Sequence, residues 1–159
     1  MTNREQEMPD LEFRRATRCD VRRIVELLVD DELGKGRDRL EDPLAAAYLA
    51  AFEAIERDPN QMILLADWRG EVVGCMQLTY LPGLSNRGAW RALIESVRVV
   101  GPLRRQGIGE ALVRHALGLA RERGCRVAQL TTHKSRTAAH RFYRRLGFEP
   151  THEGMKLVL

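Results

Sequence analysis

The sequence has none of the features that mark a membrane-spanning or secreted protein. Its 159 residues contain no apolar run long enough to cross a bilayer. The polar start, residues 1–7, has no apolar segment of the kind that forms the centre of a signal peptide. We therefore expect a cytoplasmic protein without a membrane partner.

Cysteine is scarce, and its spacing argues against a disulfide framework or a zinc site. Cys19, Cys75 and Cys125 are odd in number, far apart and without nearby histidines. Cys125 begins an apolar run, so we expect a small buried side chain there and not a nucleophile. No metal is expected.

Aromatic residues are also few, at 6% of the chain, and no stacking platform for bases is visible. The charge is unevenly distributed. Residues 1–60 hold ten Lys and Arg against fifteen Asp and Glu, a net charge of −5, whereas residues 101–150 hold eleven against three, a net charge of +8. Such a basic region attracts phosphate groups of a nucleic acid or of a nucleotide-bearing cofactor. The scarcity of aromatics makes nucleic acid the less favoured of the two.

What is present indicates one globular domain. The chain is 44% apolar and 30% charged, and its length suits a single core. Repeats and low-complexity segments are absent. We expect residues 1–9 to be a flexible leader and residues 10–159 to form one domain.

The spacing of apolar residues predicts a mixed α/β fold in the order β-α-α-β-β-β-α-β-α-β. A two-residue turn, Arg69-Gly70, is expected to join the second and third strands. Ser135 is expected to cap the last helix. The predicted strands are 11–16, 62–68, 71–81, 91–100, 126–132 and 153–159, and the predicted helices begin at 21 and cover 43–57, 108–123 and 135–146.

The most informative stretch is residues 99–113, where a strand passes through a glycine turn into a helix. Gly107 and Gly109 allow the backbone to approach a ligand closely, and the first N–H groups of the helix point outward with the positive end of the helix dipole behind them. Such a turn binds phosphate. Arg104 and Arg105 add charged donors beside it.

The spacing excludes two common phosphate loops. A nucleoside triphosphate loop needs Lys and then Ser or Thr after its last glycine, but Glu110 and Ala111 stand there. The dinucleotide fingerprint needs a third glycine at the position of Leu112. What remains is Arg104-x-x-Gly107-x-Gly109, which resembles the pyrophosphate-binding motif of the GCN5-related N-acetyltransferases, Gln/Arg-x-x-Gly-x-Gly/Ala.

A second motif carries the same resemblance. The segment from Ala139 through Phe142 and Tyr143 to Gly147-Phe148 is similar to the C-terminal motif of that family, and the two motifs stand in the family's order. The resemblance covers about residues 61–159. One position departs from it, because Arg136 stands where the family often has an Asn that contacts coenzyme A. Within the family, residues 58–60, 70–74 and 139–143 are similar to aminoalkylphosphonate N-acetyltransferases and to other members that act on small amines.

The resemblance implies direct transfer of an acetyl group from acetyl-CoA to a primary amine of a small molecule, without an acyl-enzyme. It also implies where the cofactor binds. Backbone groups of Val97 and Val99 would contact the pantetheine and the thioester. The phosphates would be held by the backbone N–H groups of Gln106, Gly107, Ile108, Gly109 and Glu110. Three arginines would add positive charge there: Arg104, Arg105 and Arg136.

Glu95 is the candidate general base. Strand alternation predicts that it shares a face with Leu93, Val97 and Val99, and apolar surroundings make a carboxylate a better proton acceptor at neutral pH. A base is needed because an aliphatic amine has a pKa near 10, so on the order of 0.1% is neutral at pH 7. The alternative is a glutamate at a strand edge, paired with Arg91 or Arg98.

Tyr143 is the candidate general acid, since the resemblance implies a phenol near the thioester sulfur. With a pKa near 10 it would keep a proton at neutral pH and give it to the departing thiolate. The alternative is an aromatic side chain of the core, which suits the neighbouring Phe142 better because a buried hydroxyl needs a partner.

The acceptor amine is not specified by the sequence. The resemblance implies a site between the N-terminal helices and the connector before the central strand. Arginines there suit an amine that carries a phosphonate, phosphate or carboxylate, and acidic residues suit a polyamine or an aminoglycoside. The residues concerned are Tyr48, Tyr80, Arg87, Trp90 and Arg91, and the acidic Asp30, Asp31 and Glu32.

Two other functions fit the same motifs. One is acetylation of protein lysines or N-termini, which would change only the acceptor site. The other is a non-catalytic module that senses acetyl-CoA or binds nucleic acid. Many members of the family are homodimers, but no interface can be identified from the sequence.

Overall fold

A computed structural model describes residues 10–31 and 36–159. The predicted leader, residues 1–9, lies outside the described residues, and so does Glu32. In chain order the elements are β1 (Leu11–Arg15), η1 (Arg18–Asp20), α1 (Val21–Val29), α2 (Ala46–Arg57), β2 (Gln61–Trp68), β3 (Glu71–Leu81), α3 (Ser85–Gly88), β4 (Arg91–Val99), η2 (Gly101–Leu103), α4 (Ile108–Glu122), β5 (Val127–Leu130) and α5 (Thr137–Arg145).

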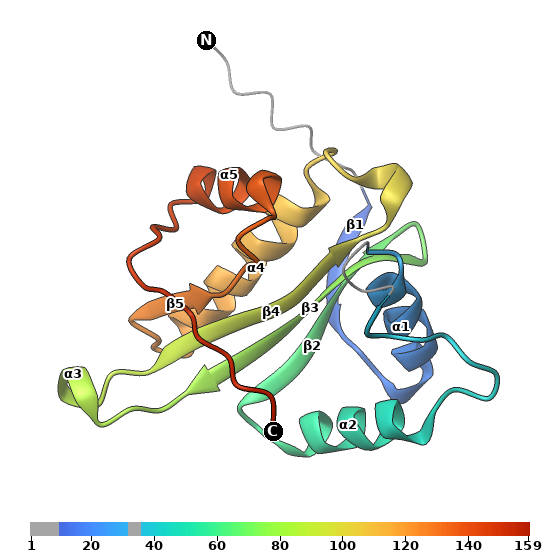
Figure 1. Cartoon of the computed structure of the whole chain (residues 1–159), viewed down its shortest axis with the longest axis horizontal. Helices are drawn as coiled ribbons and strands as arrows, with labels where there is room; N and C mark the ends of the chain where they lie inside the picture. The colour runs from blue at the N-terminus through green and yellow to red at the C-terminus, as the bar shows by residue number, and fades with distance from the viewer. Residues whose placement is uncertain (1–9, 32–35) are drawn as a thin grey trace, which may run out of the picture.

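The five strands form one mixed sheet in the order β1-β2-β3-β4-β5. Strands β1 to β4 pair with one another in antiparallel fashion, and β5 is parallel to β4. Helices α4 and α5 lie to one side of the sheet and α1 and α2 to the other (Figure 1). The predicted α/β fold class is confirmed.

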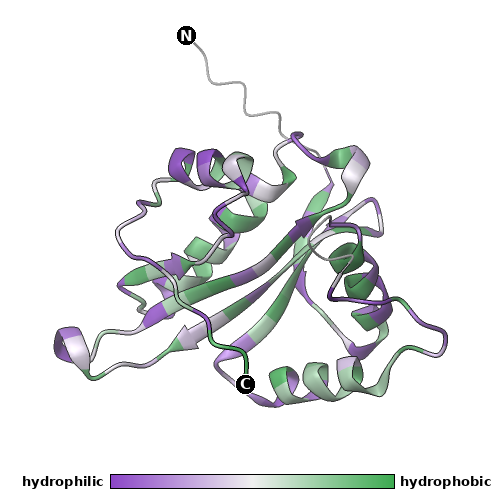
Figure 2. Ribbon diagram, viewed as in Figure 1, coloured by the Kyte–Doolittle hydropathy of each residue, from purple (hydrophilic) through white to green (hydrophobic). Residues whose placement is uncertain are grey.

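The two faces of the sheet bury two apolar clusters. The larger one joins the sheet to α4, where Ile108, Leu112 and Val113 are almost fully buried. The smaller one joins α1 to the opposite face through Ile24, Leu27, Leu65, Val72 and Cys75. Apolar residues accordingly concentrate along the strands, whereas α5 is largely hydrophilic (Figure 2). None of the helices that the structure describes is long and apolar enough to cross a membrane.

The predicted hairpin turn is confirmed. Trp68 pairs with Glu71, so Arg69 and Gly70 alone connect β2 to β3, with φ of 55° and 80°. Both values lie in the left-handed region that two-residue hairpin turns use.

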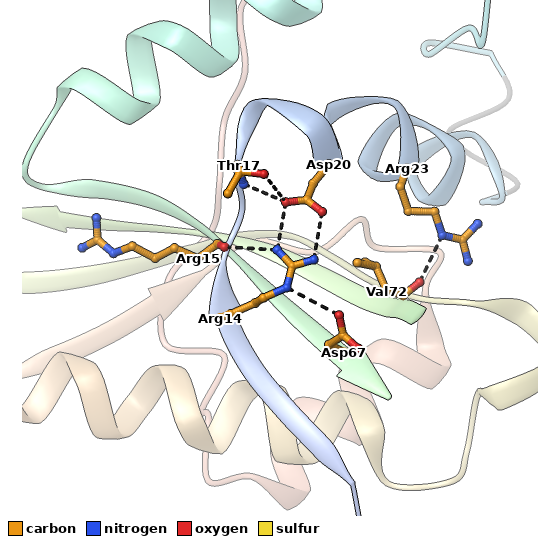
Figure 3. A network of polar contacts seen from close by, with 7 residues as sticks. All are labelled: Arg14, Arg15, Thr17, Asp20, Arg23, Asp67 and Val72. Carbon is orange, nitrogen blue, oxygen red and sulfur yellow. Dashed lines mark hydrogen bonds and ion pairs between the residues drawn. The ribbon is translucent and has the colours of Figure 1, made fainter. Parts of the chain in front are cut away.

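The start of α1 is fixed by a polar network around Arg14 (Figure 3). The Arg14 guanidinium donates two hydrogen bonds to the Asp20 carboxylate, at 2.8 and 2.9 Å, and the Thr17 N–H donates a third at 2.7 Å. The hydrogen bond from Arg14 lowers the pKa of Asp20 to about 2, and Thr17 adds to the effect. This network joins β1 to the helix that follows it.

Several predicted boundaries are wrong. The last predicted strand, residues 153–159, is not a strand, and its apolar side chains Met155, Leu157, Val158 and Leu159 are 85–111% exposed. Alternation describes a chain that could form a strand, but a strand also needs a partner edge, and the described sheet ends at β5. The helix predicted over 43–57 begins at Ala46.

The last helix also starts later than predicted. It begins at Thr137 after Arg136, and the Ser135 side chain contacts the His133 ring at 2.7 Å instead of capping the helix.

Candidate active site

The turn between β4 and α4 presents free backbone donors. The first helical hydrogen bond of α4 runs from the Ala111 N–H to the Gly107 carbonyl, at 2.9 Å. The N–H groups of Ile108, Gly109 and Glu110 therefore have no acceptor within the helix. Together with the helix dipole they provide a site for an anion.

Glycine stands at the two positions of this turn for different physical reasons. Gly107 precedes α4 with φ of 90°, a conformation that other residues rarely adopt. Gly109 has no such constraint. A Cβ there would lie 3.5 Å from Val99 Cγ2 and 3.7 Å from Phe142 Cζ, which are ordinary contacts. The protein's own packing does not require glycine at 109, and the close approach of a ligand would.

Arg104 holds the turn in place. Its Nε donates to the Val99 carbonyl at 3.0 Å, and its Nη2 donates to the Asp30 carbonyl at 2.7 Å and the Asp30 carboxylate at 3.0 Å. The guanidinium thus ties the turn to the end of α1. Arg105 and Gln106 are exposed, and the Gln106 amide donates to the Pro102 carbonyl at 3.2 Å.

Strand β4 separates from β5 just before this turn. The two strands pair only from Arg91 to Ile94 on β4, so residues 95–99 extend beyond β5. Val97 and Val99 lie in this extension and pack against the larger cluster. The predicted backbone contacts to pantetheine fall where β4 has left its parallel neighbour.

A bulge in β4 corrects the predicted alternation. Ser96 has φ of 52°, and the register with β3 shifts so that Cys75 pairs with Arg98 and Gln77 with Glu95. Glu95 and Arg98 consequently share one face, and Val97 and Val99 lie on the other. The prediction that Glu95 shares a face with Val97 and Val99 is therefore wrong, because one extra residue reverses the alternation, whereas the predicted shared face with Leu93 is confirmed.

Glu95 itself is exposed. The expected burial is therefore not found, and the described part of the chain gives Glu95 no ion-pair partner, neither Arg91 nor Arg98. Its carboxylate is open to solvent at the point where β4 leaves β5.

Tyr143 lies on α5 between two aromatic rings. Its ring contacts Phe142 and Phe148 edge to face, with centroids 4.9 and 5.7 Å apart. Burial raises the pKa of the phenol, and the positive charges of Arg98 and Arg136 partly offset this rise. The phenol therefore keeps its proton at neutral pH.

Three charged residues form a cluster beside Tyr143 that the sequence does not indicate. Asp31, just after α1, forms ion pairs with Arg98 on β4 and with Arg136 before α5. Arg98 also donates to the Val97 carbonyl at 2.9 Å. The three residues are far apart in the chain, so no local pattern could have indicated that they meet.

Cys75, which pairs across the strands with Arg98, is a poor nucleophile. Burial raises the pKa of the Cys75 thiol to about 12. The three cysteines form no disulfide. Among the described residues, no group of three or more His, Cys, Asp and Glu side chains is arranged to hold a metal ion.

Comparison with known proteins identifies the family. The sequence model of the Acetyltransferase (GNAT) family matches residues 21–148. The chain belongs to this family. It is an acetyl-CoA-dependent N-acetyltransferase, as the resemblance in the two motifs predicts.

Individual relatives and solved structures are similar to the chain over almost its whole length. An aminoalkylphosphonate N-acetyltransferase from Salmonella typhimurium is 34% identical over 96% of this chain and 94% of its own length. A transcriptional regulator from Bacillus halodurans C-125 has a crystal structure with a TM-score of 0.91 and 45% identity, covering 94% of this chain and 99% of that one. A putative acetyltransferase from Agrobacterium tumefaciens has a TM-score of 0.82 and 26% identity, covering 93% and 99%.

Proposed function

We propose that this acetyltransferase passes the acetyl group directly from acetyl-CoA to a primary amine of a small molecule, without an acyl-enzyme. The observation that carries the proposal is the arrangement around the end of β4. There, the start of α4 presents free N–H groups after the strand segment that has left β5, and Tyr143, whose phenol is influenced by the charge of Arg98 on that segment, supplies a protonated hydroxyl. The name of the Salmonella relative, which acts on a small amine, supports the same substrate class.

The cofactor would bind along this segment. Backbone groups of Val97 and Val99 would pair with the pantetheine, and the N–H groups from Gln106 to Glu110 would hold the pyrophosphate. Arg104 would act chiefly through the shape of the turn, since its Nε and Nη2 already donate to Val99 and Asp30. Arg105 is exposed beside the turn and can reach a phosphate. Arg136 would contribute positive charge near the cofactor.

The chemistry needs a base and an acid. The amine nitrogen attacks the thioester carbonyl carbon, its proton passes to Glu95 directly or through water, and the carbon–sulfur bond breaks. Tyr143 gives its proton to the departing thiolate. Exposure of Glu95 allows it to pass the proton on to solvent. The inert thiol of Cys75 agrees with a path that uses no thiol nucleophile.

The experiment that tests the proposal is turnover on a panel of amines. Purified protein and acetyl-CoA are mixed with aminoalkylphosphonates, amino acids, polyamines, aminoglycosides or lysine peptides, and free coenzyme A thiol is measured. We expect release with one class of small amine and none with the peptides. Release with lysine peptides alone would refute the proposal in favour of a protein acetyltransferase.

A second candidate function has one observation in its favour. The Bacillus halodurans structure is named a transcriptional regulator, and residues 101–150 of this chain carry a net charge of +8. A regulator of this kind would bind DNA with an affinity that falls steeply with salt. A shift titration of duplex DNA at 50 and 200 mM salt tests it.

A further inference from the structure

Among the described residues, the ion-paired cluster beside Tyr143 holds two positive charges and one negative charge. Asp31 Oδ2 lies 3.6 Å from Arg98 Nη2, and the same oxygen contacts Arg136. The side chains of Arg98, Asp31 and Arg136 are only 14%, 16% and 28% exposed. Two guanidinium groups thus share one carboxylate in a largely buried place. Asp30, by contrast, is paired with Arg104 one to one.

Such a surplus charge favours an incoming anion. A positive charge removed from water is costly unless a negative group balances it. Arg98 also has a donor to spare, because its Nε is buried and has no hydrogen-bond partner among the described residues. A guanidinium with free donors suits the oxygens of a phosphonate, phosphate or carboxylate.

Arg98 lies on the opposite face from the pyrophosphate turn. Val99 lies against the turn, since its Cγ2 is 3.5 Å from the Cβ that Gly109 lacks. The neighbouring Arg98 is directed to the other face, where it pairs across the strands with Cys75. This geometry connects Arg98 with the acceptor amine and not with the pyrophosphate of the cofactor.

The bulge at Ser96 places Arg98 and the candidate base Glu95 on the same face of β4. Glu95 and Arg98 become successive residues on one face of β4. Successive side chains on one face of a strand are roughly 7 Å apart. A short molecule with an amine at one end and an acidic group two or three carbons away can therefore reach both.

We propose that Arg98 binds the acidic group of the acceptor, which is an amine carrying a phosphonate, phosphate or carboxylate two or three carbons away. Asp31 holds the guanidinium of Arg98 in place, and Arg136 supplies the surplus positive charge. This inference rests on the proposed function, because it names the class of small amine that the enzyme acetylates.

The first test measures binding without chemistry. Methylphosphonate has no amine and cannot be acetylated, so its binding to the coenzyme A complex is followed by calorimetry. We expect Arg98→Gln to weaken this binding at least tenfold and Arg98→Lys to weaken it less. Arg121→Gln, which removes an exposed arginine from the last turn of α4, serves as the matched control and keeps the wild-type affinity. Wild-type protein that does not bind methylphosphonate would overturn the inference.

The second test compares two acceptors of similar length. We expect Arg98→Gln to raise the KM for 2-aminoethylphosphonate at least tenfold more than it raises the KM for propylamine or the Kd for acetyl-CoA. Equal losses with both amines would mean that Arg98 has only a structural role. A weakened Kd for acetyl-CoA would mean that the anion is a phosphate of the cofactor. Either result contradicts the inference.

The two tests separate this inference from the proposed function. Methylphosphonate binding that depends on Arg98, without acetylation of any amine, would refute the proposed function and leave the anion site standing. Turnover on small amines without methylphosphonate binding would refute the anion site and leave the proposed function standing.

Discussion

Tyr143 is the residue whose environment agrees best with its expected role. Burial between Phe142 and Phe148 raises the pKa of the phenol, and Arg98 and Arg136 only moderate the rise. A phenol that holds its proton at pH 7 is available to protonate a thiolate. Its hydroxyl, and not its ring, carries the role.

Tyr143→Phe therefore separates the role of the hydroxyl from the role of the ring. The ring contacts remain, so we expect kcat to fall on the order of 100-fold while the Kd for acetyl-CoA is unchanged. Steady-state kinetics and calorimetry on the same preparation measure both. A variant with the full wild-type kcat would exclude Tyr143 as the acid.

The environment of Glu95 differs from the expected one, because the residue is exposed and not buried. We expect Glu95→Gln to depress kcat/KM most at low pH, where nearly all of the amine is protonated and a base is needed. At high pH the amine arrives neutral and the two proteins should converge. The measurement is a pH–rate profile of both, with acetyl-CoA affinity as the control, and parallel profiles would remove Glu95 from the mechanism.

At the residue scale, only the residues in local motifs could be predicted. Gly107, Gly109 and Tyr143 stand in short patterns whose spacing indicates their chemistry. Arg98 and Asp31 meet only because β4 ends beside α1, and no spacing in the chain encodes that. The prediction of which face of the strand carries Glu95 is wrong for a related reason, since a bulge at a serine has no signature in the sequence.

The turn into α4 is the element on which cofactor binding depends. We expect Gly107→Val to weaken acetyl-CoA binding at least tenfold, because φ of 90° is unfavourable for valine and the N–H groups would move. Calorimetric titration with acetyl-CoA measures the loss.

Two further glycine variants make this result specific. Gly109→Ala fits the folded protein without a clash, so it should weaken acetyl-CoA binding while thermal unfolding stays close to wild type. Gly118→Ala, in the interior of the same helix with open space around it, should bind normally and be about 0.5–1 kcal/mol more stable. Unchanged binding in both Gly107→Val and Gly109→Ala would refute the assignment of the turn.

The junction between β1 and α1 depends on Asp20. Its pKa in the folded protein is about 2, below the ordinary value of 3.8, so its contribution is present at neutral pH and is lost as the pH falls from about 4 to 2. We expect Asp20→Asn to lower the free energy of unfolding by about 1–2 kcal/mol at pH 7, allowing for the partial exposure of Arg14. The difference should disappear near pH 2.

Urea unfolding at several pH values measures this difference. Asp10→Asn is the control, because the Asp10–Arg69 pair is exposed and 3.9 Å long, and its loss should cost less than 0.5 kcal/mol. A difference for Asp20→Asn that persisted at pH 2 would mean that the side chain acts through packing and not through its charge.

Elements with strong local signals could be predicted, and elements that need a distant partner could not. The hairpin at Arg69-Gly70 and the helix after Gly107 follow from turn chemistry and apolar spacing. The tail, residues 153–159, has the alternation of a strand but no partner edge in the described sheet. Apolar spacing reports which side of a segment is buried, not whether a neighbour is available to pair with it.

At the scale of the whole molecule, charge and fold point to the same region. The basic residues between 101 and 150 belong to α4, α5 and their connections, which lie on one side of the sheet (Figure 1). The described residues before position 60, which include β1, α1 and α2, hold more acidic than basic side chains. A molecule polarised in this way attracts an anionic cofactor to the side where the turn into α4 is found.

The central claim is direct transfer to a small amine. The most direct measurement combines the intact mass of the enzyme after incubation with acetyl-CoA alone with initial rates at varied acetyl-CoA and amine concentrations. Direct transfer predicts an unmodified enzyme, intersecting double-reciprocal lines and one thiol released per acetylated amine. An enzyme that gains an acetyl group and gives parallel lines would contradict it, because those results require an acyl-enzyme.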